Sequence, residues 1–470
     1  MDRASGLVRL SRDGICRQSG HHGDEVSLLE VNGLNVAFDT ADGTVRAVQG
    51  LSFSLERGQT LGIVGESGSG KSVSAQTIIG LTRSASARIS GEALFEGEDL
   101  LRMPPARLRR LRGARIGMIF QDPLSSLHPY YRVGWQIVEL LRAHDRSIDR
   151  HSARRRAIEL LDLVGIPEPA QRIDDYPHQF SGGMRQRVMI AMAMALNPSL
   201  LIADEPTTAL DVTVQAQILR VLEDLQQRFA MAIILITHDL GVIAEVADEV
   251  VVMYAGSVME RAARREVFYD SRHPYTLGLL RSLPSYDEVV ASGDFTQGPP
   301  GAPSGTATAP AGRGPGAARG LEGGPPAGAG GFAHRRLYSI PGQPPSLLGM
   351  APGCPFAPRC AHTMDRCRRE RPPLFAVGDR NSREPPPGAA TGGRASVAGG
   401  AGADARRATT GDRLPGREHL SACWLEATGG EGLAGGGGPP EVGSGGRRPH
   451  AAAHLPPETS GWLGRSGEPG

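Results

Sequence analysis

The stretch Gly65-Glu66-Ser67-Gly68-Ser69-Gly70-Lys71-Ser72 decides the fold. It fits the pattern GxxxxGK[ST] and lies between a strand-like apolar run, residues 60–64, and a helix-compatible run, residues 73–81. Glycines in that context let the backbone wrap closely around phosphates. Lys71 is then expected to reach the β- and γ-phosphates, and the Ser72 hydroxyl to ligate Mg²⁺. The alternative, a chance glycine-rich turn, is weak because the required strand and helix both flank the motif.

Other polar residues follow buried-strand patterns. The apolar run 199–203 ends in Asp204 and Glu205, which suit a Mg²⁺ ligand and a group that orients the attacking water. Gln121 and His238 end two further apolar runs, where they could reach metal, water or a γ-phosphate. Each of these residues taken by itself is more often a solvated strand end, a loop amide or a structural histidine. Their occurrence together with the phosphate loop favours a catalytic site.

A second anion-binding feature is expected at residues 181–183. Ser181, Gly182 and Gly183 precede a helical run, residues 187–196, so the serine can cap the helix and the glycines can expose its N-terminus. Ser-Gly-Gly by itself is also a commonplace turn.

Taken together and in this order, the motifs resemble those of ABC ATPases over residues 28–260. The resemblance implies an α/β phosphate-loop NTPase cassette with an antiparallel β-subdomain and a helical subdomain. It makes Gln121 the Q-loop glutamine, Glu205 the catalytic glutamate and His238 the switch histidine. The residues implied to bind ATP are Gly65, Glu66, Ser67, Gly68, Ser69, Gly70, Lys71, Ser72, Ser181, Gly182, Gly183 and Asp211.

Further implications concern metal and adenine. Ser72, Gln121 and Asp204 are implied to hold Mg²⁺, and Ala209-Leu210-Asp211 resembles the D-loop. The signature reads Phe180-Ser181-Gly182-Gly183-Met184 where LSGGQ is commonest. Phe38 is the candidate platform for adenine, and a core phenylalanine of the β-subdomain is an equally good explanation.

A closer resemblance is to the ATPases of dipeptide and oligopeptide permeases. The stretches that carry it are residues 176–187, residues 207–215, His273-Pro274-Tyr275-Thr276 and Gly353-Cys354-Pro355-Phe356-Ala357-Pro358-Arg359-Cys360. It implies a complex at the cytoplasmic face of the membrane, with a second cassette, two membrane-spanning permease subunits and an extracytoplasmic peptide-binding protein. The Ser181 helix would serve the partner cassette's ATP, and the segment between Gln121 and Ser181 would contact the permease.

Composition limits the other functions. The 470 residues carry a formal net charge of +1, which argues against a dedicated nucleic-acid partner. No stretch has the roughly 18–20 apolar residues of a membrane span.

Gly- and Pro-rich composition predicts disorder in several segments. The expected division is a tail (1–25), an ATPase domain (26–285), a linker (286–334), a Cys-containing module (335–426, with an insert at 379–417) and a second tail (427–470).

Four of the five cysteines, Cys354, Cys360, Cys367 and Cys423, lie in the C-terminal third. Four thiolates can hold a structural zinc or an iron–sulfur cluster. Zinc favours cysteine pairs two to four residues apart, which these are not, so a 4Fe–4S cluster is expected, with zinc or four packed thiols as alternatives.

Peptide import has three alternatives. Nickel, glutathione or a sugar could be the transported solute, because nothing in the cassette specifies it. A soluble ABC ATPase acting on DNA or ribosomes is disfavoured, because no long coiled coil separates the motifs and the cassette occurs once. A non-hydrolysing regulatory module is disfavoured because Glu205 and His238 are both intact.

Overall fold

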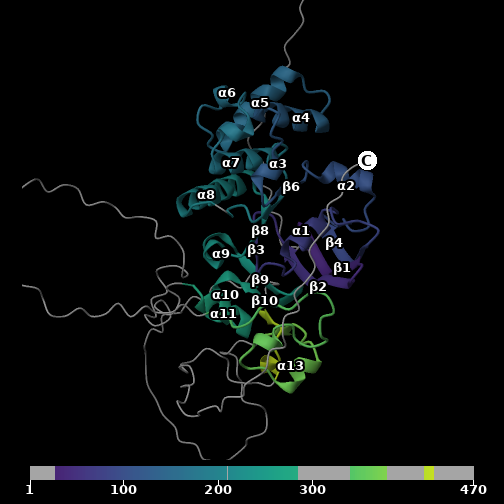
Figure 1. Ribbon diagram of the computed structural model, residues 1–470. Helices are drawn as coiled ribbons and strands as arrows, with labels where there is room; N and C mark the ends of the chain where they lie inside the picture. The colour runs from purple at the N-terminus through teal and green to yellow at the C-terminus, as the bar shows by residue number, and fades with distance from the viewer. Residues whose placement is uncertain (1–26, 209, 284–338, 378–417, 428–470) are drawn as a thin grey trace, which may run out of the picture. The chain divides into compact units, whose positions relative to one another are not determined.

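The computed structural model describes residues 27–208, 210–283, 339–377 and 418–427 (Figure 1). The predictions of disorder for the two tails, the linker and the insert concern segments that lie outside these residues, apart from Ala427 at the start of the second tail. Ala209 of the expected D-loop lies outside them too.

A parallel sheet forms the centre of the cassette. Its strands are hydrogen-bonded neighbours in the order β9-β3-β8-β7-β6. Every residue of the first four is buried, which explains their continuous apolar runs, since helices cover both faces of such sheets. The strands span β3 (Thr60–Val64), β6 (Ile116–Ile119), β7 (Leu200–Asp204), β8 (Ala232–Thr237) and β9 (Glu249–Tyr254).

An antiparallel subdomain continues this sheet in the order β5-β4-β1-β2, and its presence confirms the prediction. Strand β10 (Ser257–Ala263) joins the two parts, because it pairs with β9 and, at Ser257, with Gln49 of β2. The subdomain strands are β1 (Leu29–Thr40), β2 (Gly43–Leu55), β4 (Ala87–Phe95) and β5 (Glu98–Asp99).

A helical subdomain lies between Gln121 and Ser181, as expected, and gathers at the top of Figure 1. It contains α3 (Pro123–Ser126), α4 (Val133–His144), α5 (Arg150–Leu163) and α6 (Pro169–Arg172). Asp149 begins α5 as its N-cap, accepting hydrogen bonds from the backbone N–H groups of His151 and Ser152. The short helix η1 (Pro177–Gln179) connects the helical subdomain to α7.

The other helices pack on the sheet. They are α1 (Lys71–Ile78), α2 (Pro105–Leu111), α7 (Gly182–Ala193), α8 (Val212–Phe229), α9 (Leu240–Val246), α10 (Arg264–Tyr269) and α11 (Pro274–Arg281). Among the described residues, no helix combines the length and the apolar character that a membrane crossing requires.

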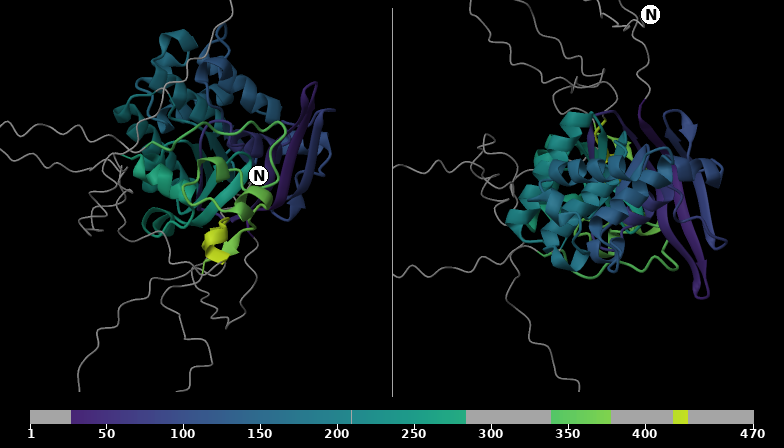
Figure 2. Two further views of the ribbon diagram at one scale, coloured as in Figure 1. Left: turned by 60° about the horizontal axis from the view of Figure 1, so that its bottom comes forward. Right: turned by 90° about the horizontal axis from the view of Figure 1, so that it is seen from above.

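Residues 339–377 and 418–427, called the C-terminal module below, attach to strand β10. Strand β12 pairs with β10, through Glu260↔Ser421 and Arg261↔Leu420, and also with β11. Figure 2 shows residues 418–427 in yellow beside the green residues 339–377. The elements are η3 (Ala357–Arg359), α13 (Asp365–Arg369), β11 (Phe375–Ala376), β12 (Leu420–Ser421) and α14 (Trp424–Ala427).

A buried carboxylate secures this attachment. Glu260 of β10 has no solvent exposure. Its oxygens contact His419 Nε2 at 2.7 Å and accept hydrogen bonds from the backbone N–H groups of Arg272 and His273, at 2.6 and 3.1 Å. Burial alone would raise the pKa of Glu260, but the hydrogen bond and charge of His419 outweigh it and lower that pKa. Glu260 is therefore ionised in the fold and depends on His419.

The first prediction concerns this pair. His419→Ala should lower the free energy of unfolding by about 3–5 kcal/mol, because it removes the ring that pairs with the buried Glu260 carboxylate and leaves the Ser271 hydroxyl as a side-chain donor. Denaturant unfolding of the full-length chain measures the change. Asp174→Asn is the control, because it breaks the exposed Arg154–Asp174 pair, for which a change of about 0–1 kcal/mol is expected. An equal effect of the two substitutions would contradict the role of His419.

The second prediction concerns pH. Burial lowers the pKa of His273 to about 4 from an ordinary 6.5. Between these values the unfolded chain binds a proton that the native chain does not, so stability should fall as the pH drops from about 6.5 to 4. His273 Nδ1 also accepts the Tyr275 N–H at the start of α11.

His273→Asn keeps a side-chain acceptor at that cap and removes the titration. Unfolding free energies measured across this pH range should depend less steeply on pH in the variant. A slope equal to the wild-type slope would show that His273 is not the responsible group.

Candidate functional site

The loop between β3 and α1 has the shape that phosphate binding requires. Gly65 and Gly70 adopt positive φ angles of 151° and 97°. A Cβ atom at Gly65 would lie 2.0 Å from the Met253 carbonyl oxygen, and one at Gly70 would lie 2.3 Å from that of Ala47. Only glycine therefore fits at these two positions, which bring β9 and β2 against the loop.

Lys71 begins α1 and is buried beneath the loop. Its Nζ donates hydrogen bonds to the Gly65 and Glu66 carbonyl oxygens, at 2.8 and 3.0 Å. Burial lowers the pKa of Lys71, although the nearby carboxylates of Glu205, Asp204 and Glu66 favour its charge. The ammonium group thus lies among the loop carbonyls, where the motif places a phosphate ligand.

Ser72 and Asp204 come together from distant parts of the chain. The Ser72 hydroxyl donates to Asp204 Oδ1 at 2.8 Å. Asp204 ends β7 with 3% exposure, and burial raises the pKa of its carboxyl group. A hydroxyl and a carboxylate that meet in a desolvated place beside a phosphate loop are a donor set that fits Mg²⁺.

Glu205 is the centre of a polar cluster. Its Oε2 accepts hydrogen bonds from Gln121 Nε2 at 3.0 Å and from Thr208 Oγ1 at 2.9 Å, and His238 Nδ1 lies 3.6 Å away. The backbone of Glu205 adopts a left-handed conformation, φ 48°, of the strained kind that concentrates at functional sites. The structure thus brings the three predicted catalytic side chains together.

This cluster refines the expectation for Gln121, whose amide contacts the Glu205 carboxylate, whereas Ser72 contacts Asp204. Thr208 was not singled out as a site residue. The only signal in the sequence is its position three residues after Glu205, at the start of the Thr208-Ala209-Leu210-Asp211 stretch.

The signature residues lie at the N-terminus of α7. Ser181 is exposed and caps the helix by accepting the Met184 N–H at 3.3 Å. Gly182 and Gly183 form the first turn of α7, which begins and ends earlier in the chain than the predicted helical run 187–196. Asp211 has an analogous position, because its carboxylate accepts the Val214 N–H at 3.0 Å and caps α8. Binding of nucleotide by these residues stays a prediction.

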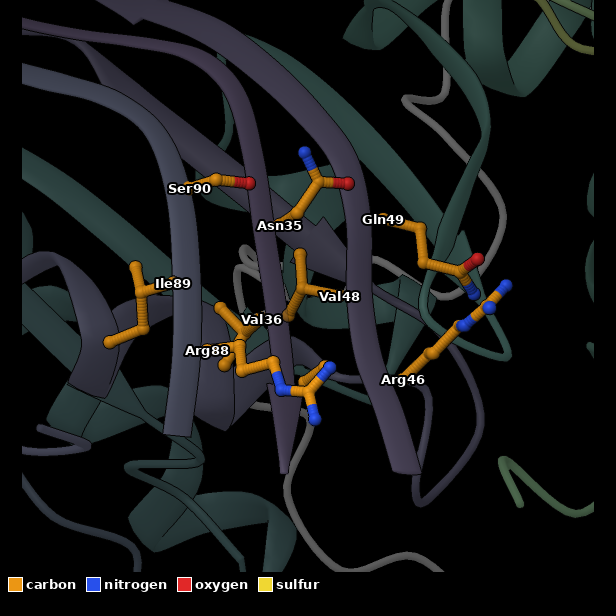
Figure 3. A pocket seen from close by; sticks show the side chains of 9 residues that line it. Asn35, Val36, Arg46, Val48, Gln49, Arg88, Ile89 and Ser90 are labelled. Carbon is orange, nitrogen blue, oxygen red and sulfur yellow. The ribbon is translucent and has the colours of Figure 1, made fainter. Parts of the chain in front are cut away.

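Phe38 is half-buried in β1 and packs against the core of the antiparallel subdomain. A hollow of about 310 Å³ lies on the same subdomain, and Figure 3 shows Asn35, Arg46, Gln49, Arg88 and Ser90 among its lining residues. None of the predicted nucleotide-binding residues, Phe38 included, lines it. This hollow is therefore distinct from the predicted ATP site, and the adenine role of Phe38 stays a prediction.

The four clustered cysteines line one small cavity of about 20 Å³ in the C-terminal module. Burial raises the pKa of Cys354 to about 11 and that of Cys423 to about 12, so both are neutral thiols at physiological pH. Within the described ranges, no group of three or more His, Cys, Asp or Glu side chains is placed to hold a metal ion.

These findings correct the metal prediction for Cys354, Cys360, Cys367 and Cys423. A cavity of about 20 Å³ has room for about one water molecule and not for a four-iron cluster. The iron–sulfur cluster, and zinc as its alternative, are not supported. Cys354 and Cys367 pack with Ala357, Met364 and Trp424 as small apolar groups, which is the third possibility that the sequence left open.

Comparison with known proteins agrees with this geometry. The family described as "ABC transporter" matches residues 48–208, and the family described as "Oligopeptide/dipeptide transporter, C-terminal region" matches residues 259–312 and 331–367. The oligopeptide transport ATP-binding protein OppD of Bacillus subtilis is 47% identical over 353 residues, which cover 75% of this chain and 86% of that protein. The chain belongs to the ABC transporter ATP-binding proteins of the OppD/DppD family.

Two further relatives support the membership. OppD of Salmonella typhimurium is 47% identical over 349 residues, covering 74% of this chain and 90% of that protein. The dipeptide transport ATP-binding protein DppD of Bacillus subtilis is 45% identical over 346 residues, covering 73% and 90%. The chain is thus an ATP-hydrolysing transporter cassette, as its motifs predicted.

The third prediction concerns hydrolysis. Glu205→Gln should lower ATP turnover by about 10²–10⁴-fold, because a neutral amide cannot accept a proton from the attacking water. ATP binding should persist, whereas Lys71→Ala should weaken binding itself. Turnover is measured with the assembled transporter and binding with the full-length chain.

Thr208→Val tests the support of the carboxylate. Removing the hydroxyl should lower turnover by about tenfold, because Oε2 then loses one of its hydrogen-bond donors. Wild-type turnover in Glu205→Gln would show that another group orients the water.

Proposed function

We propose that this chain couples ATP hydrolysis to the import of oligopeptides or dipeptides. The proposal is supported by the names of its relatives and by the match of its C-terminal region to the oligopeptide/dipeptide transporter family. The observation that carries it is the co-occurrence, in one chain, of an intact hydrolytic cluster around Glu205 and that C-terminal region.

Each step of hydrolysis has residues suited to it. The backbone of residues 65–70 and the Lys71 ammonium bind the phosphates. Ser72 and Asp204 would hold Mg²⁺, and the bound ion would neutralise phosphate charge. Glu205 accepts the proton of the attacking water, and Thr208 and Gln121 fix the carboxylate that does so. His238, with 60% of its side chain exposed, is free to contact the γ-phosphate.

A second cassette completes the site in this proposal. Ser181, Gly182 and Gly183 present the N-terminus of α7, whose dipole favours an anion. Their exposure suits binding of the partner cassette's nucleotide, with this chain's phosphate loop facing the partner's signature. Closure of the pair around ATP then transmits movement to the permease.

The helical subdomain is the proposed contact for two membrane-spanning permease subunits. Tyr130, Tyr131 and Trp135, at the start of α4, are exposed by 82%, 44% and 49%. Exposed aromatic side chains of this kind are enriched at protein interfaces. The complex would lie at the cytoplasmic face of the membrane and receive peptide from an extracytoplasmic binding protein.

Experiments would reveal either of two alternative functions. The same machinery could import nickel, glutathione or a sugar, which growth on defined peptides would reveal. A soluble, non-transport ABC ATPase would co-purify with ribosomes or DNA in place of permease subunits.

The fourth prediction concerns assembly. The full-length chain should show low ATPase activity by itself, because each active site needs the signature of a second cassette. Activity should rise when the permease and the second cassette are present, and rise further with loaded peptide-binding protein. Full activity of the purified monomer, independent of its concentration, would overturn this arrangement.

Gly182→Asp isolates the contribution of the signature. The added Cβ would lie an ordinary 3.7 Å from Leu210, so the fold should tolerate it, while the carboxylate repels phosphate. ATPase activity of the complex should fall by about tenfold or more, and ATP affinity of the single chain should not change. A fall in the affinity of the single chain would place the signature at the chain's own nucleotide.

A further inference from the structure

Glu66, the second residue of the phosphate loop, has each of its polar groups engaged. Its backbone N–H donates to the Tyr275 hydroxyl at 3.1 Å, and its carbonyl oxygen accepts from Lys71 at 3.0 Å. Its two carboxylate oxygens both accept from Arg359 Nη1, at 3.0 and 2.9 Å. Arg359 belongs to the C-terminal module, 293 residues further along the chain.

Hydrogen bonds hold the Arg359 side chain to both the C-terminal module and the cassette. Its side chain is 7% exposed. It donates to the carbonyl oxygen of Pro341 at 2.9 Å within its own module, and to the Tyr254 hydroxyl at 3.1 Å on the cassette. Burial alone would lower the pKa of Arg359, but the hydrogen bonds with Glu66 and Tyr254 outweigh it and raise that pKa. The guanidinium is therefore a permanent cation between the module and the loop.

Three aromatic rings pack together where the C-terminal module contacts the phosphate loop. Phe356, three residues before Arg359, is 3% exposed and lies 5.4 Å from the ring of Tyr254 and 5.3 Å from that of Tyr275. The Arg359 guanidinium is thus shielded from water, and the Glu66 carboxylate, with 24% of its side chain exposed, is partly shielded, which strengthens the interaction.

An ion pair elsewhere in the module shows the contrast. Arg366 and Glu370 pair at 3.0 Å, with side chains 53% and 58% exposed. Such a pair contributes little. The Arg359–Glu66 pair differs because its side chains are only 7% and 24% exposed and because one arginine nitrogen bridges both carboxylate oxygens.

We propose that Arg359 is a positioning residue for ATP binding: it holds the Glu66 end of the phosphate loop, so that the C-terminal module sets the cassette's affinity for ATP. The chain of contacts runs from Pro341 through Arg359 to Glu66 and on to Lys71. Displacement of the module would release the loop residue whose carbonyl oxygen binds the phosphate-facing lysine. Because this concerns the binding of ATP alone, it does not depend on which solute is transported.

The effect should appear in affinity and not in the chemical step. Glu205 and its partners, Gln121 and Thr208, lie outside this chain of contacts. Loosening the loop weakens its hold on the phosphates before the reaction begins, so the KM for ATP should rise while kcat is retained.

The experiment is a double-mutant cycle on the full-length chain. Arg359→Gln should raise the Kd for ATP by about tenfold, and Glu66→Gln by a similar factor. The double variant should bind no more weakly than the weaker single variant, because both changes remove the same interaction. In the assembled transporter, Arg359→Gln should raise the KM for ATP and leave kcat unchanged.

Arg369→Gln is the matched control, because Arg369 is an exposed arginine of the same module and the substitution is chemically identical. Its Kd should equal that of the wild type. Thermal unfolding is recorded for every variant. If Arg359→Gln does not fold, Arg359→Lys, which keeps the charge and loses the planar fork, should show a smaller rise in Kd.

Three results would overturn the proposal. They are an unchanged Kd in folded Arg359→Gln, effects of Arg359→Gln and Glu66→Gln that multiply in the double variant, and a loss of kcat with an unchanged KM. Each can occur whether or not the transporter imports peptides, so failure of the two proposals can be told apart.

Discussion

The parallel register of β3, β8 and β7 is the constraint on which the site depends. Val64 lies opposite Thr237, and Asp204 lies opposite Ile236, so all three strands end at the same edge of the sheet. That alignment brings the Ser72 hydroxyl to the Asp204 carboxylate across 132 residues of sequence. Without this alignment, the phosphate loop and the end of β7 would have the same residues, but Ser72 and Asp204 would not meet.

Much of this arrangement could be predicted, because the deciding signals are local. Continuous apolar runs identify β3, β7 and β8 as strands buried on both faces. Polar residues directly after such runs meet at the carboxyl edge of the sheet, which is why the sequence predicts that Glu205, Gln121 and His238 lie together. The antiparallel and helical subdomains followed from the resemblance of the motifs to those of ABC ATPases and not from periodicity.

What could not be predicted depends on contacts between distant residues. The sequence gives no sign that Arg359 reaches Glu66, since arginine is mostly a surface residue and the two are 293 positions apart. The cysteines are the opposite case, because the sequence predicts for them a metal site that the structure does not support. Their grouping in the sequence suggested metal ligands, whereas spacing alone does not show whether thiols are ionised. In the fold, burial raises the pKa of Cys354 and of Cys423, and Cys354 packs against apolar neighbours.

The position of β12 has a consequence for the life of the polypeptide in the cell. Residues 418–427 are the last part of the chain that the structure describes, yet they supply both strand β12, which pairs with β10 and β11, and the histidine that pairs with Glu260. A ribosome that stops before this segment would release a chain in which Glu260 lacks His419 and β10 lacks its pairing with β12. Such a product would open locally and be degraded, so that incomplete cassettes would be removed before they could occupy a place in a membrane complex.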